Sequence, residues 1–152
     1  FTHAITMTAT RKFAAIDNLI ARPRAAVTLG AALPGTATVD TANDYVIRTG
    51  WGYDVTVDGV RCIAGNPAGT WIALPGHSAA AFNGSLRVRG SSGAGCELRV
   101  WINGVAIGTV TLAVGEALAD STALAVSVPK GLVVVRMEVV SGDYALRGVT
   151  VD

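Results

Sequence analysis

The sequence has few charges, few aromatic rings and no long apolar run. Charged residues make up 15% of the 152 residues and the net charge is +1, so no bulk field attracts nucleic acid. No apolar stretch approaches the roughly 20 residues that a membrane-spanning helix needs. Hydrophobic residues make up 51%, which excludes a disordered chain and is enough for one real core. We therefore expect one folded domain over residues 1–152, with neither nucleic acid nor membrane as a partner.

The sequence also lacks catalytic motifs. Its two histidines, His3 and His77, are far apart and stand in no nucleophile motif. A phosphate-binding loop and a His-Glu-x-x-His metal motif are both missing. A glycosidase needs two placed carboxylates, and Glu97 and Glu138 are the acids that we expect on a sheet face. We expect no catalytic residue and no required cofactor.

Cysteine is scarce, with Cys62 and Cys96 as the two copies. One pair cannot complete a structural zinc site. Both residues stand beside expected strand ends next to glycine-rich turns, which favours a disulfide over two buried free thiols. Such a bond would stabilise the fold by roughly 2–4 kcal/mol and would indicate an oxidising, extracellular setting.

What the chain does have is glycine, 18 residues of it, with valine, threonine and isoleucine spread throughout. This composition favours many short strands. Strands at spacings of about ten residues predict an antiparallel β-sandwich of the jelly-roll kind. The expected strands of the second half are 85–89, 97–102, 105–114, 123–128, 132–140 and 144–151. Asn103-Gly104 predicts a type I′ hairpin turn, with Gly108 as a bulge in the returning strand.

The first half is less regular. Residues 13–29 are ambiguous: the apolar residues from Phe13 to Ile20 have helical spacing, but Pro23 would end any helix near Ala21. The expected strands of this half are 4–8, 45–48, 53–57 and 71–74. We expect Trp71 to lie in the core.

Alternation within the strands sorts side chains into inward and outward sets. The outward set is Arg87, Arg89, Arg99, Trp101, Arg136 and Glu138. Charges on a solvated sheet face need no function, and Trp101 could pack under a loop. A tryptophan on a polar face is nevertheless unusual, because a large ring gains by burial. We therefore predict an arginine-rich groove on neighbouring strands, with Trp101 as its platform.

Further candidates lie in turns and loops. Trp51 has a glycine on each side, Tyr53 lies two residues after it, Tyr144 follows a turn, and Asn103 lies two residues after Trp101. We add these four to the ligand-binding candidates. A calcium site at Asp40, Asn43 and Asp44 is conceivable, but ordinary turn chemistry explains those residues better.

Three segments carry a family resemblance. Gly69-Thr-Trp-Ile-Ala-Leu-Pro75 resembles the Gly-Asp-Trp-Ile-x-Phe segment of carbohydrate-binding modules of families 6 and 35. Residues 82–112 follow the order of these modules: a strand, a glycine-rich loop, a strand, Asn-Gly and a return strand. Residues 131–151 are similar to their final hairpin. The resemblance covers residues 69–152 and implies a jelly-roll sandwich attached to a secreted polysaccharide-degrading enzyme.

The chain departs from the family pattern in the usual loop-end cleft. One aromatic position of that cleft falls on Cys62 or Ile63, and the other falls in residues 116–126, which hold no aromatic. The position of its asparagine falls near Ala145. A structural calcium is in doubt, because Thr6 and Thr8 occupy the strand in which the family has a glutamate.

We therefore expect a non-catalytic carbohydrate-binding module, excised from a larger secreted enzyme whose catalytic domain shares its polypeptide. Sugar sites combine apolar platforms with a few placed polar groups, and acidic sugars add a need for arginine. The expected ligand is an acidic polysaccharide, such as xanthan or a uronate-containing glycan, bound on the sheet face. The alternatives are a structural or receptor-binding domain of a phage tail or adhesin, and a small lyase or glycosidase.

Overall fold

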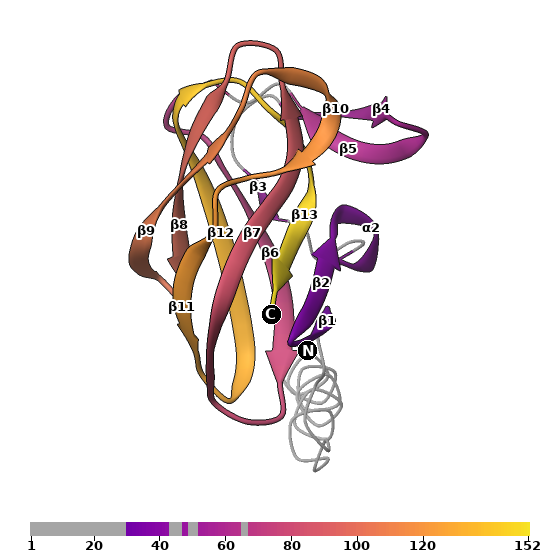
Figure 1. Ribbon diagram of the computed structural model, residues 1–152. Helices are drawn as coiled ribbons and strands as arrows, with labels where there is room; N and C mark the ends of the chain where they lie inside the picture. Colours follow the sequence, from indigo (N-terminus) through magenta and orange to yellow (C-terminus); the bar gives the residue numbers. More distant parts are fainter. Residues whose placement is uncertain (1–29, 43–46, 49–51, 65–66) are drawn as a thin grey trace, which may run out of the picture.

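The chain folds into two stacked β-sheets. The computed structural model describes residues 30–42, 47–48, 52–64 and 67–152 (Figure 1). Sheet A runs in the order β1 (Ala31–Leu33), β6 (Trp71–Ser78), β12 (Gly131–Gly142), β8 (Cys96–Ile102) and β9 (Val105–Leu112), with β3 (Ile47–Arg48) also beside β6. The strands pair in antiparallel fashion except for the short β1–β6 pair.

Sheet B completes the sandwich. Its order is β10 (Gly115–Asp120), β7 (Phe82–Ser92), β13 (Ala145–Val151), β5 (Val60–Ala64) and β4 (Tyr53–Val57). In addition, β11 (Leu124–Val128) pairs with β7, and β2 (Gly35–Thr38) pairs with β13. The one short helix, among the described residues, is α2 (Val39–Ala42). The predicted all-β sandwich is thus confirmed, and no described helix is long and apolar enough to cross a membrane.

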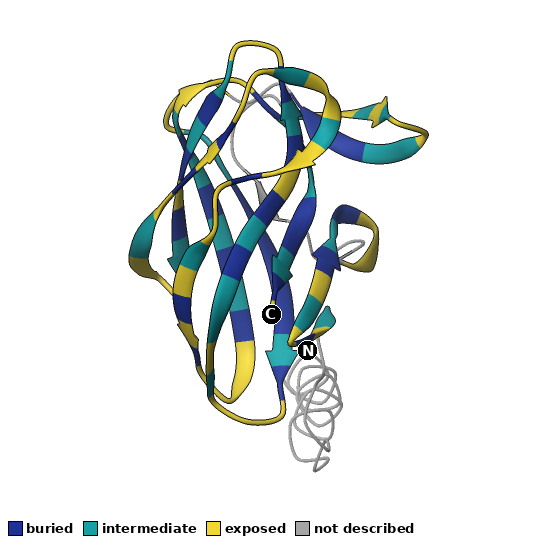
Figure 2. Cartoon of the chain, in the orientation of Figure 1, coloured by how far each residue is buried: buried dark blue, intermediate teal, exposed yellow. Residues whose placement is uncertain are grey.

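The core lies between the sheets and follows from alternation. Buried and less buried residues alternate along the central strands, as the banding in Figure 2 shows. The largest fully buried side chains are Ile63, Ile72, Leu74, Leu86, Leu98, Leu112, Met137 and Leu146, with Val39, Val88, Val100 and Val110. Both sheets contribute, so each has one face in the core and one face outward.

The predicted hairpin is confirmed at Asn103-Gly104. Both residues have positive φ, 48° and 82°, as a type I′ turn requires. Beyond the turn, the β8–β9 register shifts where Trp101 pairs with Ala106 and Val100 pairs with Gly108. The expected irregularity at Gly108 is therefore present.

The loop at residues 93–95 carries the chain from sheet B to sheet A. Consequently β7 and β8 lie in different sheets, and the prediction that their outward arginines line one groove is wrong. Alternation fixes which face of a strand is buried, but it does not fix the strand's neighbour.

The disulfide prediction is also wrong, because both cysteines are free and buried. Cys62 lies on β5 of sheet B and Cys96 on β8 of sheet A. Each thiol faces a nearby carbonyl, of Val60 and of Glu97, at 3.8 Å. Burial raises the pKa of Cys96 to about 11. The thiols therefore act as small apolar core groups.

Candidate functional site

The outer face of sheet A brings an arginine and two tryptophans together. Arg136 lies on the central strand β12, opposite Trp101 on β8 and Ala73 on β6. One row further along, Glu138 lies opposite Trp71 and Arg99. These side chains point outward because their neighbours on the same strands point into the core. We call Trp71, Arg99, Trp101, Arg136 and Glu138 the sheet A platform.

The Arg136 guanidinium lies between the two indole rings of the platform. Its central carbon is 4.2 Å from the ring centroid of Trp101 and 5.3 Å from that of Trp71. Both distances fall within the range of cation–π contacts. Arg136 Nε and Trp101 Nε1 are buried without a hydrogen-bond partner. Within the described residues, the guanidinium therefore contacts both rings, while its Nε makes no hydrogen bond.

Arg136 also differs from the other arginines in charge pairing. Five further arginine side chains are described, and each forms an ion pair with a carboxylate; they are Arg61, Arg87, Arg89, Arg99 and Arg147. Within the described part of the chain, Arg136 has no ion pair. A half-buried cation without a counter-ion favours an anionic ligand, because a partly desolvated charge gains from a partner.

Arg99 and Glu138 form the second polar element of the platform. Their charged groups are 3.6 Å apart, and the side chains are 46% and 24% exposed. Glu97 lies on the same face of β8, opposite Thr111 of β9 and Ser141 of β12. Among the residues that the structure describes, the platform therefore contains one neutralised pair beside one cation without an ion pair.

The expectation that Trp71 belongs to the core is wrong. Trp71 is half-buried on the outer face, while its neighbour Ile72 is fully buried. The alternation that placed Trp101 on the outer face also places Trp71 there, because Ile72 and Leu74 of β6 both point into the core. That signal was available in the sequence, and it would have added Trp71 to the site.

Arg87 and Arg89 lie on the outer face of sheet B instead. Arg87 pairs with Asp152 at 3.3 Å, and Arg89 pairs with Asp120 at 3.1 Å. Arg89 also lines a 280 Å³ cavity. Both guanidinium groups are already neutralised by a carboxylate. Because β7 belongs to sheet B, neither arginine is part of the sheet A platform.

Two of the candidates from turns and loops, Tyr53 and Tyr144, lie around a different cavity. Tyr53, Tyr144, Glu116 and Asp143 all line a pocket of about 270 Å³. Tyr53 is 57% exposed, whereas Tyr144 is buried and its hydroxyl has no hydrogen-bond partner. Burial raises the pKa of Tyr144. Trp51 lies outside the described residues.

Asn103 has a structural contact in the turn. Its side-chain amide donates to the Leu132 carbonyl at 3.0 Å, and its side-chain oxygen accepts from the Val134 amide at 2.7 Å. These two bonds fasten the β8–β9 turn to β12. The amide is thus engaged within the fold, beside the platform rather than in it.

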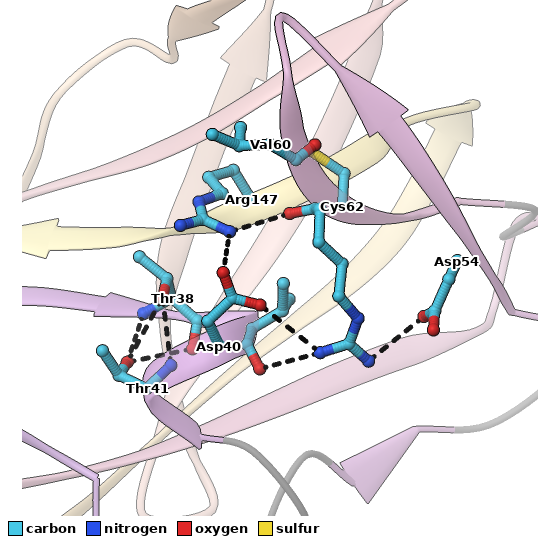
Figure 3. Close-up of polar contacts among 9 residues, drawn as sticks. Thr38, Asp40, Thr41, Asp54, Val60, Cys62 and Arg147 are labelled. Atoms are coloured by element: carbon cyan, nitrogen blue, oxygen red, sulfur yellow. Dashed lines mark hydrogen bonds and ion pairs between the residues drawn. The ribbon is translucent and has the colours of Figure 1, made fainter.

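Asp40, from the calcium candidates, belongs to a chain of charge pairs (Figure 3). Its carboxylate accepts from Arg147 at 2.7 Å and lies 3.6 Å from Arg61, which pairs with Asp54 at 3.2 Å. Asn43, Asp44, Thr6 and Thr8 lie outside the described residues. Among those described, no group of three or more His, Cys, Asp and Glu side chains could hold a metal ion.

Comparison with solved structures identifies the architecture. The fold is that of carbohydrate-binding modules. A family 35 carbohydrate-binding module from Clostridium thermocellum matches with a TM-score of 0.61 and 15% identity, over 76% of this chain and 95% of that one. The module CsCBM6-3 from Clostridium stercorarium, in complex with cellobiose, matches with a TM-score of 0.67 and 13% identity, over 81% and 96%. The resemblance noted over residues 69–152 is confirmed and extends over more of the chain.

A third match comes from a larger protein. The exo-beta-1,3-galactanase of Phanerochaete chrysosporium, in complex with beta-1,3-galactotriose, matches with a TM-score of 0.63 and 11% identity, over 83% of this chain and 30% of that one. No protein-family model and no curated protein matches the sequence. At these identities the likeness to carbohydrate-binding modules concerns the fold, and the site rests on this chain's own residues.

Proposed function

We propose that this protein is a non-catalytic carbohydrate-binding module that binds an acidic polysaccharide on the sheet A platform. The observation that carries the proposal is Arg136, a cation that lies over two indole rings and has no ion pair among the described residues. Sugar rings bind to apolar ring surfaces, and the partly exposed indoles of Trp71 and Trp101 supply such surfaces.

The stacked arginine favours a carboxylate as the anionic group. A guanidinium is planar and offers parallel N–H donors that match the two oxygens of a carboxylate. Because the central carbon of the guanidinium lies over both rings, its terminal N–H groups are the donors that we propose for a planar carboxylate. We therefore propose a uronate or a pyruvate ketal as the group that contacts Arg136.

The structural neighbours support a wider role. CsCBM6-3 was solved with cellobiose, and the galactanase carries this fold within a longer enzyme chain. These likenesses support a module that holds a secreted polysaccharide-degrading enzyme at its substrate. They do not favour a phage-tail or adhesin domain.

Calorimetry and affinity electrophoresis against matched polysaccharides test the proposal. We expect binding to polygalacturonate or xanthan, and much weaker binding to the same polymer after its carboxyl groups are reduced to alcohols. Trp101→Ala should abolish binding while the far-ultraviolet circular dichroism stays unchanged. Arg136→Gln should weaken binding to the carboxylated polymer at least tenfold, about 1.4 kcal/mol, and should leave binding to the reduced polymer as it is.

Arg87→Ala is the matched control. It removes a partly exposed arginine from the opposite sheet, and we expect it to bind like the parent protein. Retained affinity in the Trp101 and Arg136 variants would refute the platform, and no retardation by any polymer of a broad panel would refute carbohydrate binding.

A further inference from the structure

Glu138 has two basic neighbours on the sheet A platform. Arg99 stands opposite it on β8, and Arg136 precedes it by two residues on β12. Residues two apart on a strand lie about 6.6 Å apart on one face, within reach of these long side chains. The Arg136 guanidinium also contacts Trp71, which lies directly opposite Glu138, so the cation leans toward that row.

Glu138 nevertheless pairs with Arg99 and not with Arg136. The Arg99–Glu138 separation is 3.6 Å, and Arg136 has no ion pair within the described residues. We infer that Arg99 is a positioning residue, which holds the Glu138 carboxylate away from Arg136 and so keeps the guanidinium open to an acidic ligand. This inference rests on the proposed function, because an open guanidinium matters only if an anion binds there.

Removal of Arg99 should therefore weaken ligand binding, because Glu138 would then compete with the ligand for Arg136. Glu138 is 24% exposed, and a partly buried carboxylate that loses its partner is destabilised. Arg136 is the nearest remaining cation of the platform, and pairing with it would place the protein's own carboxylate where the ligand carboxylate binds. A competing ion pair of about 1.4 kcal/mol lowers affinity about tenfold.

Four variants separate this role from direct contact between Arg99 and the ligand. We expect Arg99→Ala to bind an oligogalacturonate about tenfold more weakly in calorimetry. Arg99→Lys should bind nearly normally, because any cation there holds Glu138. The double variant Arg99→Ala with Glu138→Gln should recover the affinity, whereas Arg99→Ala with Glu97→Gln, which removes another carboxylate from the same face, should not.

A second measurement needs no ligand. If Glu138 draws Arg136 out of the stack, the near-ultraviolet circular dichroism of the tryptophans should change in Arg99→Ala and return in the Glu138→Gln double variant. Parent-like affinity of Arg99→Ala, or no recovery in the double variant, would overturn the inference while the proposed function stands. If the parent binds no oligogalacturonate or other glycan, the proposed function fails, and an unchanged dichroism in Arg99→Ala would then overturn the positioning role as well.

Discussion

The charge pairs around Asp40 give a prediction about stability and pH. Arg147, on β13, donates to Asp40 at 2.7 Å and to the Arg61 carbonyl at 2.9 Å (Figure 3). Its side chain is 18% exposed, whereas that of Asp40 is 50% exposed. Asp40 thus supplies the charge that neutralises a mostly buried guanidinium, and it ties α2 to sheet B. We predict that Asp40→Asn destabilises the fold.

The size of this destabilisation depends on how exposed the Asp40 side chain is. A hydrogen bond to a charged group contributes about 1.5–3 kcal/mol when it is shielded, and an exposed pair contributes about 1 kcal/mol or less. Because Asp40 is half exposed, we expect Asp40→Asn to lower the free energy of unfolding by about 1 kcal/mol at pH 7, or the melting temperature by about 2–4 °C. Urea unfolding followed by tryptophan fluorescence measures it.

The pH dependence has a definite sign. The hydrogen bond from Arg147 is the largest cause that lowers the pKa of Asp40, with partial burial acting against it and the charges of Arg147 and Arg61 reinforcing it. A carboxyl whose pKa is lower in the folded state stabilises the fold above its unfolded pKa of about 3.9. That contribution is lost as the pH falls through the folded pKa. The difference between parent and variant should therefore be full at pH 7 and should shrink below pH 4.

Asp120→Asn is the matched control for this measurement. Asp120 pairs with Arg89, and both side chains are about half exposed. We expect its replacement to cost only a few tenths of a kcal/mol. The reasoning would be refuted if Asp40→Asn cost no more than Asp120→Asn, or if its cost stayed constant from pH 7 to pH 3.

Two further predictions concern packing. Gly148→Ala should destabilise the fold by about 2 kcal/mol, because a Cβ at this position would lie 2.2 Å from the Ala37 carbonyl oxygen of β2. Gly115→Ala is the control, because a Cβ there meets open space, and it should be nearly neutral. Thermal unfolding measures both variants. A thiol reagent at pH 8 should modify Cys62 and Cys96 only after unfolding, because burial raises the pKa of both thiols. A reductant should leave the melting temperature unchanged, because both cysteines are free. Fast labelling of the native protein would contradict this prediction.

The sequence predicted local structure best where one pattern decides it. Strong alternation located β8, β11 and β12 to within a few residues, and Asn103-Gly104 located the turn. The strands that were missed, β1, β2, β5 and β10, are short or rich in small and polar residues. A short strand is defined by the partner that accepts its hydrogen bonds, and that partner is distant in sequence.

The candidate site was predictable in part for the same reason. Alternation placed Arg99, Trp101, Arg136 and Glu138 outward, and the structure brings these four together. It could not exclude Arg87, because an outward residue of one sheet has the same local pattern as an outward residue of the other. Which strands are neighbours depends on the whole fold.

The position of Arg136 on the central strand of sheet A suits the proposed binding site. Its strand, β12, pairs with β6 over residues 131–138 and with β8 over residues 135–142, so Arg136 lies where both neighbours are present. The inward neighbours Val135 and Met137 are almost fully buried, so the backbone under the guanidinium is fixed by the core. A site on rigid strands needs little ordering when the ligand arrives, and less of the interaction energy is lost to conformational entropy. The same strand therefore anchors the core with one face and presents the charge with the other.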